Sequence, residues 1–311
     1  MKKKISIVTA CYNEEENVEE CYRQIKAQFD LLPEYEYEHI FIDNASKDAT
    51  VTILRRLAAE DRNVKLILNS KNFGHIRSPF HGLMQAHGDA VILTVADLQD
   101  PASLIPQFIE KWEEGNKVVI GVKKKSAENA LVFMLRKTFY YLIGKSTSIE
   151  HISNFTGFGL YDQSFIETLR HVNDPYPYFR GLVAELAPGY YKIPYEQPAR
   201  FKGKTKNNLY TLYDMAMLGF VNYSKLPLRL ACFIGFVVAI ISLLLGLIYF
   251  VYKLCYWDSF NVGMAPLVIG LFFFSAVQLF FIGIIGEYIG AIYTQVKKRP
   301  LVVEKERVNF D

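Results

Sequence analysis

Residues 90 to 101 read Ala-Val-Ile-Leu-Thr-Val-Ala-Asp-Leu-Gln-Asp-Pro. The apolar run at 90–95 has the length of a strand, and two acids and a proline follow it. The run predicts a buried strand, and the proline predicts that a helix starts just beyond it. Asp97 and Asp100 then follow the carboxyl end of the strand. Because ligands of open α/β sheets bind beyond that end, this stretch indicates both the fold class and the place to search for a site.

Similar apolar runs surround this stretch and alternate with helical patterns. The runs cover residues 5–10, 37–43, 64–68 and 118–122, and the helical patterns cover residues 14–29, 48–60, 76–86 and 101–114. This alternation predicts an α/β domain with a mostly parallel sheet flanked by helices. Beyond residue 123 the pattern is irregular, with one helical stretch near residues 129–143.

The excess of hydrophobic residues lies near the C-terminus. Of the 311 residues, 51% are hydrophobic, and two nearly uncharged runs cover residues 230–252 and 266–293. Each is long enough to cross the ~30 Å hydrocarbon core of a membrane as a helix. Residues 207–225 have the composition of a helix lying in the membrane interface. We therefore expect a catalytic domain at 1–206, juxtamembrane helices at 207–229, two transmembrane helices at 230–293 and a tail at 294–311.

Basic residues flank the two runs and predict their orientation. Positive charge gathers before the first run and after the second, whereas the loop between them carries only Lys253 and Asp258; the flanking residues are Lys225, Arg229, Lys297, Lys298 and Arg299. We expect both termini on the cytoplasmic face of the plasma membrane. Glycines at 283, 286 and 290 would permit close helix packing in a homo-oligomer, and for Glu287 we expect a structural role rather than direct catalysis.

Composition excludes several other classes. A net charge of only +3, with no basic helix, argues against a nucleic-acid partner. The cysteines, at 11, 21, 232 and 255, lack metal-ligand spacing and are expected to be reduced. The N-terminal Met-Lys-Lys-Lys precedes an apolar run that is too short for a signal peptide and is read as the first strand.

Three polar clusters follow the predicted strands. They read ACYNEEEN at 10–17, DNASKDAT at 43–50 and VADLQDP at 95–101. A diphosphate leaving group needs a divalent cation, and Asp97 is the carboxylate that we expect to hold it. The alternative is helix capping, by Ser46 or Asp48 in the second cluster and by Asp97 or Asp100 in the third.

These clusters, with NFGHIRSPFHGLMQAHGD at 72–89 between them, resemble the inverting nucleotide-sugar glycosyltransferases of the GT-A fold. Within that group, later motifs resemble the branch of dolichyl-phosphate mannose synthase and bactoprenol glucosyltransferase. These motifs are FRGL at 179–182, IPY at 193–195, the basic run at 200–206, PLR at 227–229, GEYIG at 286–290 and KRP at 298–300. The resemblance covers nearly the whole chain.

The resemblance implies a role for each matching residue. The nucleotide end of the donor would contact Ala10, Tyr12, Glu14 and Asp43. Mg²⁺ or Mn²⁺ and the diphosphate would contact Asp97, with Gln99 as a further ligand. A loop carrying Arg200 and Lys206 would cover the diphosphate and the acceptor phosphate. As bare charges, these last two would otherwise be read as a solvated surface run.

Two departures from the family pattern stand out. Val95 occupies a position where the family usually has an acid, so metal binding would depend on Asp97 and Gln99. The acceptor passage, NFTGFGLYD at 154–162, has its only acid at Asp162. Either Asp162 or Asp100 is therefore a candidate for positioning the acceptor.

The absence of an obvious general base favours a phosphate acceptor, which is already anionic near neutral pH. We therefore expect inverting transfer from a nucleotide diphosphate sugar, with UDP preferred over GDP, to an undecaprenyl-type polyprenyl phosphate. Two alternatives remain open: transfer to a sugar hydroxyl of a lipid-linked glycan, and a non-catalytic membrane partner that keeps the fold. A processive synthase is disfavoured because neither Trp112 nor Trp257 lies in a Gln-x-x-Arg-Trp motif.

Overall fold

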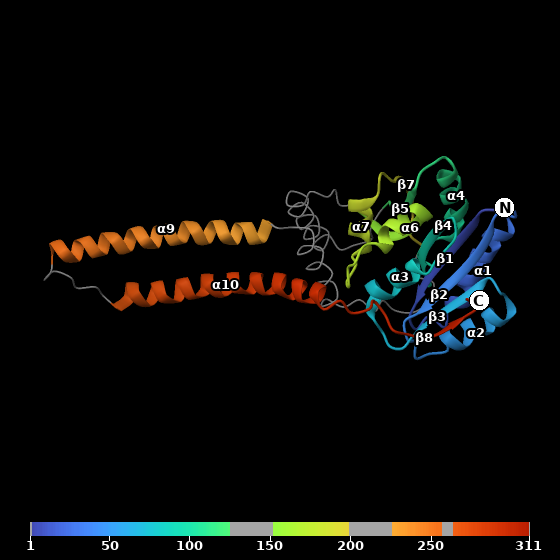
Figure 1. Cartoon of the computed structure of the whole chain (residues 1–311), viewed down its shortest axis with the longest axis horizontal. Coiled ribbons are helices and arrows are strands. Elements are labelled where there is room, and N and C mark those ends of the chain that lie inside the picture. The colour runs from blue at the N-terminus through green and yellow to red at the C-terminus, as the bar shows by residue number, and fades with distance from the viewer. Residues whose placement is uncertain (1, 125–151, 199–225, 257–263, 311) are drawn as a thin grey trace.

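The structure, a computed structural model, describes residues 2–124, 152–198, 226–256 and 264–310. It consists of an α/β domain from which two long helices project side by side (Figure 1). The helical stretch expected near residues 129–143 and the interfacial helix expected at 207–225 lie outside the described residues.

The domain is built on one eight-stranded sheet with the strand order β7-β5-β6-β4-β1-β2-β3-β8. β6 and β8 run against the direction of their neighbours, and the other pairings among β1 to β5 and β7 are consistent with a single direction. The strands are β1 (Lys4–Cys11), β2 (Glu36–Asp43), β3 (Val64–Asn69), β4 (Ala90–Val95), β5 (Val118–Lys123), β6 (Phe155–Asp162), β7 (Tyr191–Tyr195) and β8 (Glu304–Val308). The expected mostly parallel sheet is confirmed.

Helices cover both faces of the sheet, as expected. One face packs against α3 (Gly74–Met84), α6 (Gln163–Arg170) and α7 (Phe179–Leu186) through a core that includes Phe80, Phe165 and Leu182. The other face packs against α1 (Val18–Asp30), α2 (Thr50–Glu60) and α4 (Ile105–Glu113), which follows a short 3-10 helix (Ala102–Leu104). Burial of this apolar surface is the main stabilising term of the domain.

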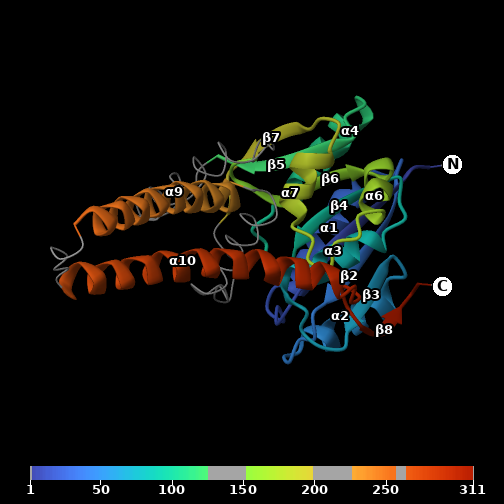
Figure 2. The ribbon, with the colours of Figure 1, turned by 60° about the vertical axis from the view of Figure 1, so that its left-hand side comes forward.

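The two projecting helices are α9 (Leu226–Cys255) and α10 (Met264–Val296). Both are long and apolar enough to cross a membrane. Only 6% of the apolar stretch within Leu228–Tyr252 of α9 is buried, and none of the apolar stretch within Gly270–Val296 of α10 is buried. Figures 1 and 2 show them side by side, extending away from the domain. An exposed apolar surface of this length calls for a lipid or protein environment rather than water.

Part of the segment expected to be a tail, residues 304–308, forms a strand of the sheet. β8 pairs antiparallel with β3, with Glu304 opposite Asn69 at the carboxyl end of β3. Arg55 of α2 holds the strand through a two-pronged ion pair with Glu306, with N–O distances of 2.8 and 2.6 Å. The chain therefore returns from α10 to the same domain that precedes α9.

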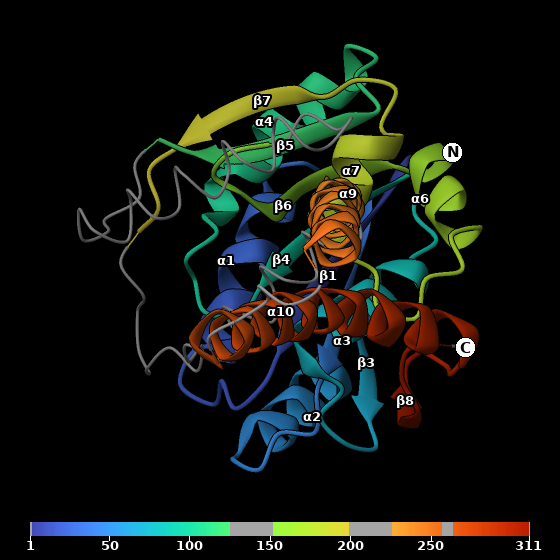
Figure 3. The same cartoon turned by 90° about the vertical axis from the view of Figure 1, so that its left-hand side faces the viewer.

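The carboxyl ends of the parallel strands face α9 and α10. β1 starts near the N-terminus, which lies at the end of the domain away from the two helices, and runs towards them (Figure 1). β2 and β4 pair parallel with β1, and β3 pairs parallel with β2. Seen from the helices, α9 and α10 stand in front of the sheet (Figure 3). Loops at this edge therefore lie on the side of the apolar helices.

Candidate functional site at the carboxyl edge

After each of the strands β1 to β4, one residue near the carboxyl edge lies in the left-handed backbone region. Asn13 follows β1 with a φ of 52°, Ala45 follows β2 with 61°, Gly74 follows β3 with 87° and Leu98 follows β4 with 61°. Three of these are not glycine, and side chains with a Cβ rarely adopt this conformation. Such local strain tends to gather at binding sites, where the surrounding contacts hold it.

Hydrogen bonds between side chains and backbone join the loops after β1 and β2. The Asn13 N–H donates to Ser46 Oγ at 2.8 Å, and the Lys47 N–H donates back to Asn13 Oδ1 at 2.7 Å. The Glu14 N–H donates to Thr50 Oγ1 at 2.8 Å. These hydrogen bonds hold residues 13 and 14 in the loop after β1. As a result, α1 begins at Val18 rather than near residue 14 as expected.

Asp43 ends β2 and is buried, with 1% of its surface exposed. Its carboxylate accepts the Ser46 N–H at 2.9 Å and the Ser46 hydroxyl. Burial raises the pKa of Asp43, and the hydrogen bonds from Ser46 oppose that rise. Asp43 therefore stabilises the loop that follows it through its hydrogen bonds with Ser46. A contact between Asp43 and the donor nucleotide stays a prediction.

The expected cap of α2 is only partly seen. Asp48 Oδ1 accepts the Thr50 N–H at 3.1 Å, as an acid beside a helix start can. Ser46 is not a cap, because its hydroxyl oxygen accepts the Asn13 N–H rather than an N–H from the first turn of α2.

Asn44 joins the loops after β2 and β3. Its amide nitrogen donates to Asn72 Oδ1 at 2.9 Å and to the Gly74 carbonyl at 3.2 Å. Its amide oxygen accepts the Phe73 N–H at 2.9 Å and Asn69 Nδ2 at 3.3 Å. One buried side chain therefore holds the start of α3 against the end of β2.

Asp97 and Gln99 lie in the loop after β4, and the side chains of both are partly exposed. Asp97 Oδ1 accepts the Gln99 N–H at 3.1 Å in a tight turn around Leu98. Neither the 3-10 helix nor α4 has a side-chain cap, so the capping alternative for Asp97 and Asp100 is wrong. Asp97 is thus available at the edge for a ligand.

The described residues fit a divalent cation only with the help of a substrate. In the part of the chain that the structure describes, no three His, Cys, Asp or Glu side chains come together as a metal cluster. Mg²⁺ is often held by one or two carboxylates together with substrate phosphates. Asp97, with the amide oxygen of Gln99, suits that mode, whereas Val95 offers no ligand at the same edge although 39% of its surface is exposed.

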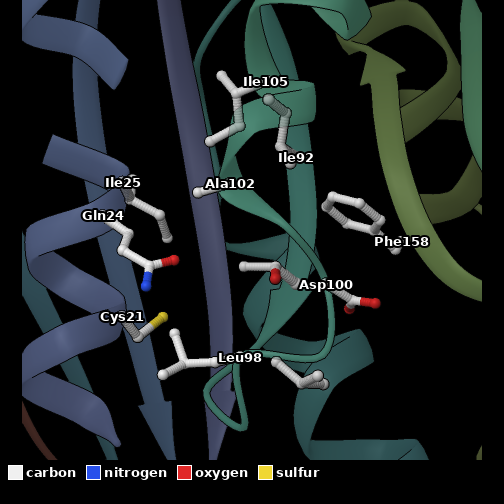
Figure 4. Close-up of a pocket in the computed structure, with 11 residues that line it drawn as sticks. Cys21, Gln24, Ile25, Ile92, Leu98, Asp100, Ala102, Ile105 and Phe158 are labelled. Carbon is white, nitrogen blue, oxygen red and sulfur yellow. The ribbon is translucent and has the colours of Figure 1, made fainter. Parts of the chain in front are cut away.

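Asp100, three residues after Asp97, lines a partly enclosed pocket (Figure 4). Apolar side chains, Ile92 and Phe158 among them, line the pocket, and Tyr195 from β7 donates its hydroxyl to Asp100 Oδ1 at 3.1 Å. Burial, and then the charge of Asp97, raise the pKa of Asp100 to about 7. In the sequence, Tyr195 appears only as part of the IPY motif. Its contact with Asp100 depends on the pairing of β7 with β5, which the spacing of residues along the chain does not predict.

Asp162 does not join this site. It pairs with Ala90 at the start of β4, so it lies at the opposite edge of the sheet from Asp97. Its carboxylate caps α6 through the Ser164 N–H and accepts Trp112 Nε1–H at 2.8 Å. The expectation that Asp162 positions an acceptor with the other site residues is therefore corrected, and Asp100 is the remaining candidate for that role.

The structure brings most of the other expected residues to one edge. The Ala10 carbonyl accepts the Ala96 N–H at 3.2 Å, which places the loop with Tyr12 and Glu14 beside the loop of Asp97. Arg200 and Lys206 lie outside the described residues. Their roles, and those of the nucleotide-contacting residues, remain predictions.

The family model and the similar curated proteins indicate the same family. A model described as glycosyl transferase family 2 matches residues 6–170. The chain is 35% identical over 307 residues to the uncharacterized glycosyltransferase YkcC of Bacillus subtilis, covering 98% of this chain and 94% of that protein. It is 34% identical over 304 residues to the SfII prophage-derived bactoprenol glucosyl transferase of Shigella flexneri, covering 97% of this chain and 98% of that protein.

Among solved structures, glucosyl-3-phosphoglycerate synthase from Mycobacterium tuberculosis, in complex with Mn²⁺, UDP and phosphoglyceric acid, aligns with a TM-score of 0.52. The alignment covers 70% of this chain and 76% of that one at 18% identity. At that identity the likeness concerns the GT-A fold alone.

Proposed function

Because the chain belongs to glycosyl transferase family 2, we propose that this glycosyltransferase moves a sugar from a UDP-sugar to an undecaprenyl-type polyprenyl phosphate. The product is a lipid-linked monosaccharide formed at the cytoplasmic face of the membrane. The relatives named bactoprenol glucosyl transferase, which align over nearly their whole length, support a polyprenyl lipid as acceptor.

The observation that carries the proposal is the direction of the parallel strands. They run towards α9 and α10 (Figure 1). Asp97 and Asp100 follow β4, so they lie at the end of the domain nearest the apolar helices. A polyprenyl phosphate has its tail in the bilayer and its phosphate at the surface. A site on the membrane side of the domain suits that acceptor better than it suits a freely diffusing one.

The chemistry follows from the charges of the two substrates. An oxygen of the acceptor phosphate attacks the anomeric carbon while the bond from that carbon to the donor diphosphate breaks, and in-line attack inverts the sugar carbon. The phosphate is already anionic, so the step needs no proton acceptor. A divalent cation, held by Asp97 and Gln99, would neutralise the leaving diphosphate. We assign the same task to Arg200 and Lys206.

The return of the chain to the domain supports the proposed topology. β8 follows α10 and pairs with β3, while α9 follows the rest of the domain, so both ends of the helix pair connect to one folded unit. The basic residues Lys297, Lys298 and Arg299 lie at that end. Positive charge favours the cytoplasmic side, which agrees with a cytoplasmic catalytic domain.

One observation favours a second candidate, transfer to a sugar hydroxyl. That reaction needs a general base, and Asp100 combines a pKa of about 7 with a position next to Asp97. The two products differ chemically, because a sugar phosphodiester is labile in mild acid and a glycoside is not.

The test compares Asp97→Ala with Glu110→Ala in the full chain. Glu110 lies on α4 with 67% of its side chain exposed and serves as the control for loss of one acid. With a labelled UDP-sugar and undecaprenyl phosphate, Asp97→Ala is expected to lower lipid labelling by at least about a hundredfold, and Glu110→Ala to leave it unchanged. Equal labelling by Asp97→Ala and the unmodified chain would refute the metal-dependent mechanism. No labelling by the unmodified chain from any donor would favour the non-catalytic alternative.

A further inference from the structure

A second cavity lies beside the end of α10, away from the candidate site. Its volume is about 620 Å³, within the range of small-molecule sites. Three segments line it: the second half of α3, the end of α6 with the loop that follows, and the connection from α10 to β8. None of its lining residues belongs to the loops after β1, β2 or β4, so it is not part of the site described above.

The cavity combines an apolar wall with a basic rim. Phe80, Leu169 and Leu301 supply apolar surface, and Lys298 and Arg299 supply positive charge. Among the described residues, no acid forms an ion pair with either of these two cations. Lys298 has a φ of 44°, because the chain turns sharply after α10 to run along the cavity.

The other two charged groups of the lining are engaged elsewhere. Arg170 pairs with Glu167 and donates to the carbonyls of Met84 and Ala86. Asp174 accepts the Gln295 amide at 2.9 Å and the Tyr176 N–H at 2.8 Å. Asp174 therefore fastens the end of α10 to the loop after α6, but these neutral donors leave its negative charge in place. Because Glu167 balances Arg170, the two cations Lys298 and Arg299 outnumber the one remaining acid among the described lining residues, and the net charge of the lining is positive.

The length of α10 sets the level of the cavity relative to a membrane. Its 33 residues would extend about 50 Å at 1.5 Å per residue. A bilayer is about 40–45 Å thick including its headgroup layers. A helix of that length, crossing from the far surface, brings Gln295 and the basic residues after it to the headgroups on the side of the domain.

We propose that this cavity binds the headgroup of an anionic phospholipid. The lipid phosphate lies against Lys298 and Arg299, and the glycerol with the first acyl carbons lies on the apolar wall. Basic segments just beyond a membrane helix attract anionic lipids in general, but a cavity adds a defined place for one of them. The inference depends on the proposed membrane anchoring and not on the proposed reaction.

The experiment titrates the detergent-purified full chain with dihexanoyl phosphatidylglycerol, a water-soluble anionic phospholipid, and follows binding by calorimetry. Lys298→Ala removes one charge from the rim, and Val172→Trp fills the cavity without changing charge. Lys297→Ala is the matched control, because Lys297 belongs to the same basic run but directs its ammonium to the Tyr293 hydroxyl at 2.8 Å and does not line the cavity.

Lys298→Ala and Val172→Trp are each expected to weaken phosphatidylglycerol binding about tenfold, and Lys297→Ala less than about twofold. The thermal unfolding midpoint of each variant establishes that it folds. Equal losses for Lys297→Ala and Lys298→Ala, with none for Val172→Trp, would overturn the proposal in favour of diffuse surface charge. Binding of glycerol 1-phosphate or dihexanoyl phosphatidylcholine as tightly as phosphatidylglycerol would also overturn it. No sugar donor is present, so the result is independent of the proposed reaction.

Discussion

Replacement of Asn44 by alanine tests the idea that hydrogen bonds between loops hold the candidate site. The side chain is 6% exposed and makes four hydrogen bonds, to Asn72, Gly74, Phe73 and Asn69. A neutral hydrogen bond contributes a net ~1 kcal/mol, and some of the stranded partners regain water, so we expect a loss of about 3 kcal/mol in the free energy of unfolding. For a domain of this size, that loss lowers the unfolding midpoint by about 6–12 °C.

The assay is thermal unfolding of the full chain in detergent, followed by near-ultraviolet circular dichroism. Asn116→Ala provides the matched control, because the Asn116 side chain donates a single hydrogen bond, to the Lys111 carbonyl at 2.8 Å, in the turn after α4. Its expected shift is about 2–4 °C. If Asn44→Ala shifts the midpoint no more than Asn116→Ala does, the hydrogen bonds of Asn44 do not hold the loops together.

Three further predictions concern charge. Burial of Glu38 opposes its ionisation, but hydrogen bonds from Lys4, Lys65 and Ser6 lower its pKa from 4.5 to about 2, so the ionised form stabilises the fold above pH 4.5. Glu38→Gln should cost roughly 3 kcal/mol at pH 7, and the difference in unfolding free energy should vanish as the pH falls from 4.5 to about 2; a constant difference would contradict it. Tyr195→Phe removes a hydrogen bond that lowers the pKa of Asp100, so the pKa of Asp100 should rise. If the rate of sugar transfer increases as Asp100 ionises, that increase should move to higher pH. A pH–rate profile that does not move would exclude Asp100 from the reaction. Val95→Asp adds a solvent-accessible carboxylate beside Asp97 and should lower the Mn²⁺ concentration for half-maximal transfer about tenfold, which a metal titration measures.

The sequence predicts the first half of the domain well because the hydrophobic pattern and the strand ends agree there. Each of the five expected strands lies within one residue of its observed bounds, as with Ala90–Val95. The start of α1 is less accurate, because hydrogen bonds of Asn13 and Glu14 with the neighbouring loop, rather than helix propensity, decide where the helix begins.

The missed strands have other physical causes. β8 reads Glu-Lys-Glu-Arg-Val and lacks apolar alternation, and ion pairs such as Arg55 with Glu306 supply its side-chain contacts. β6 contains Gly159, where an added Cβ would lie 2.5 Å from the Val119 carbonyl oxygen. Glycine usually disfavours strands, but here the close approach of β5 leaves no room for a side chain. Asp162 lies away from Asp97 because β6 runs antiparallel to β4, so the last residue of β6 pairs with the first residue of β4. The spacing of apolar residues does not indicate this strand direction.

The most direct test of the central claim gives the purified full chain a panel of labelled UDP-sugars and GDP-sugars with undecaprenyl phosphate, with Mg²⁺, Mn²⁺ or a chelator. Label in the lipid phase is then counted before and after mild acid. We expect labelling from one UDP-sugar that depends on the cation and is released by mild acid. Labelled lipid that survives mild acid, or labelling that persists in the chelator, would contradict this expectation.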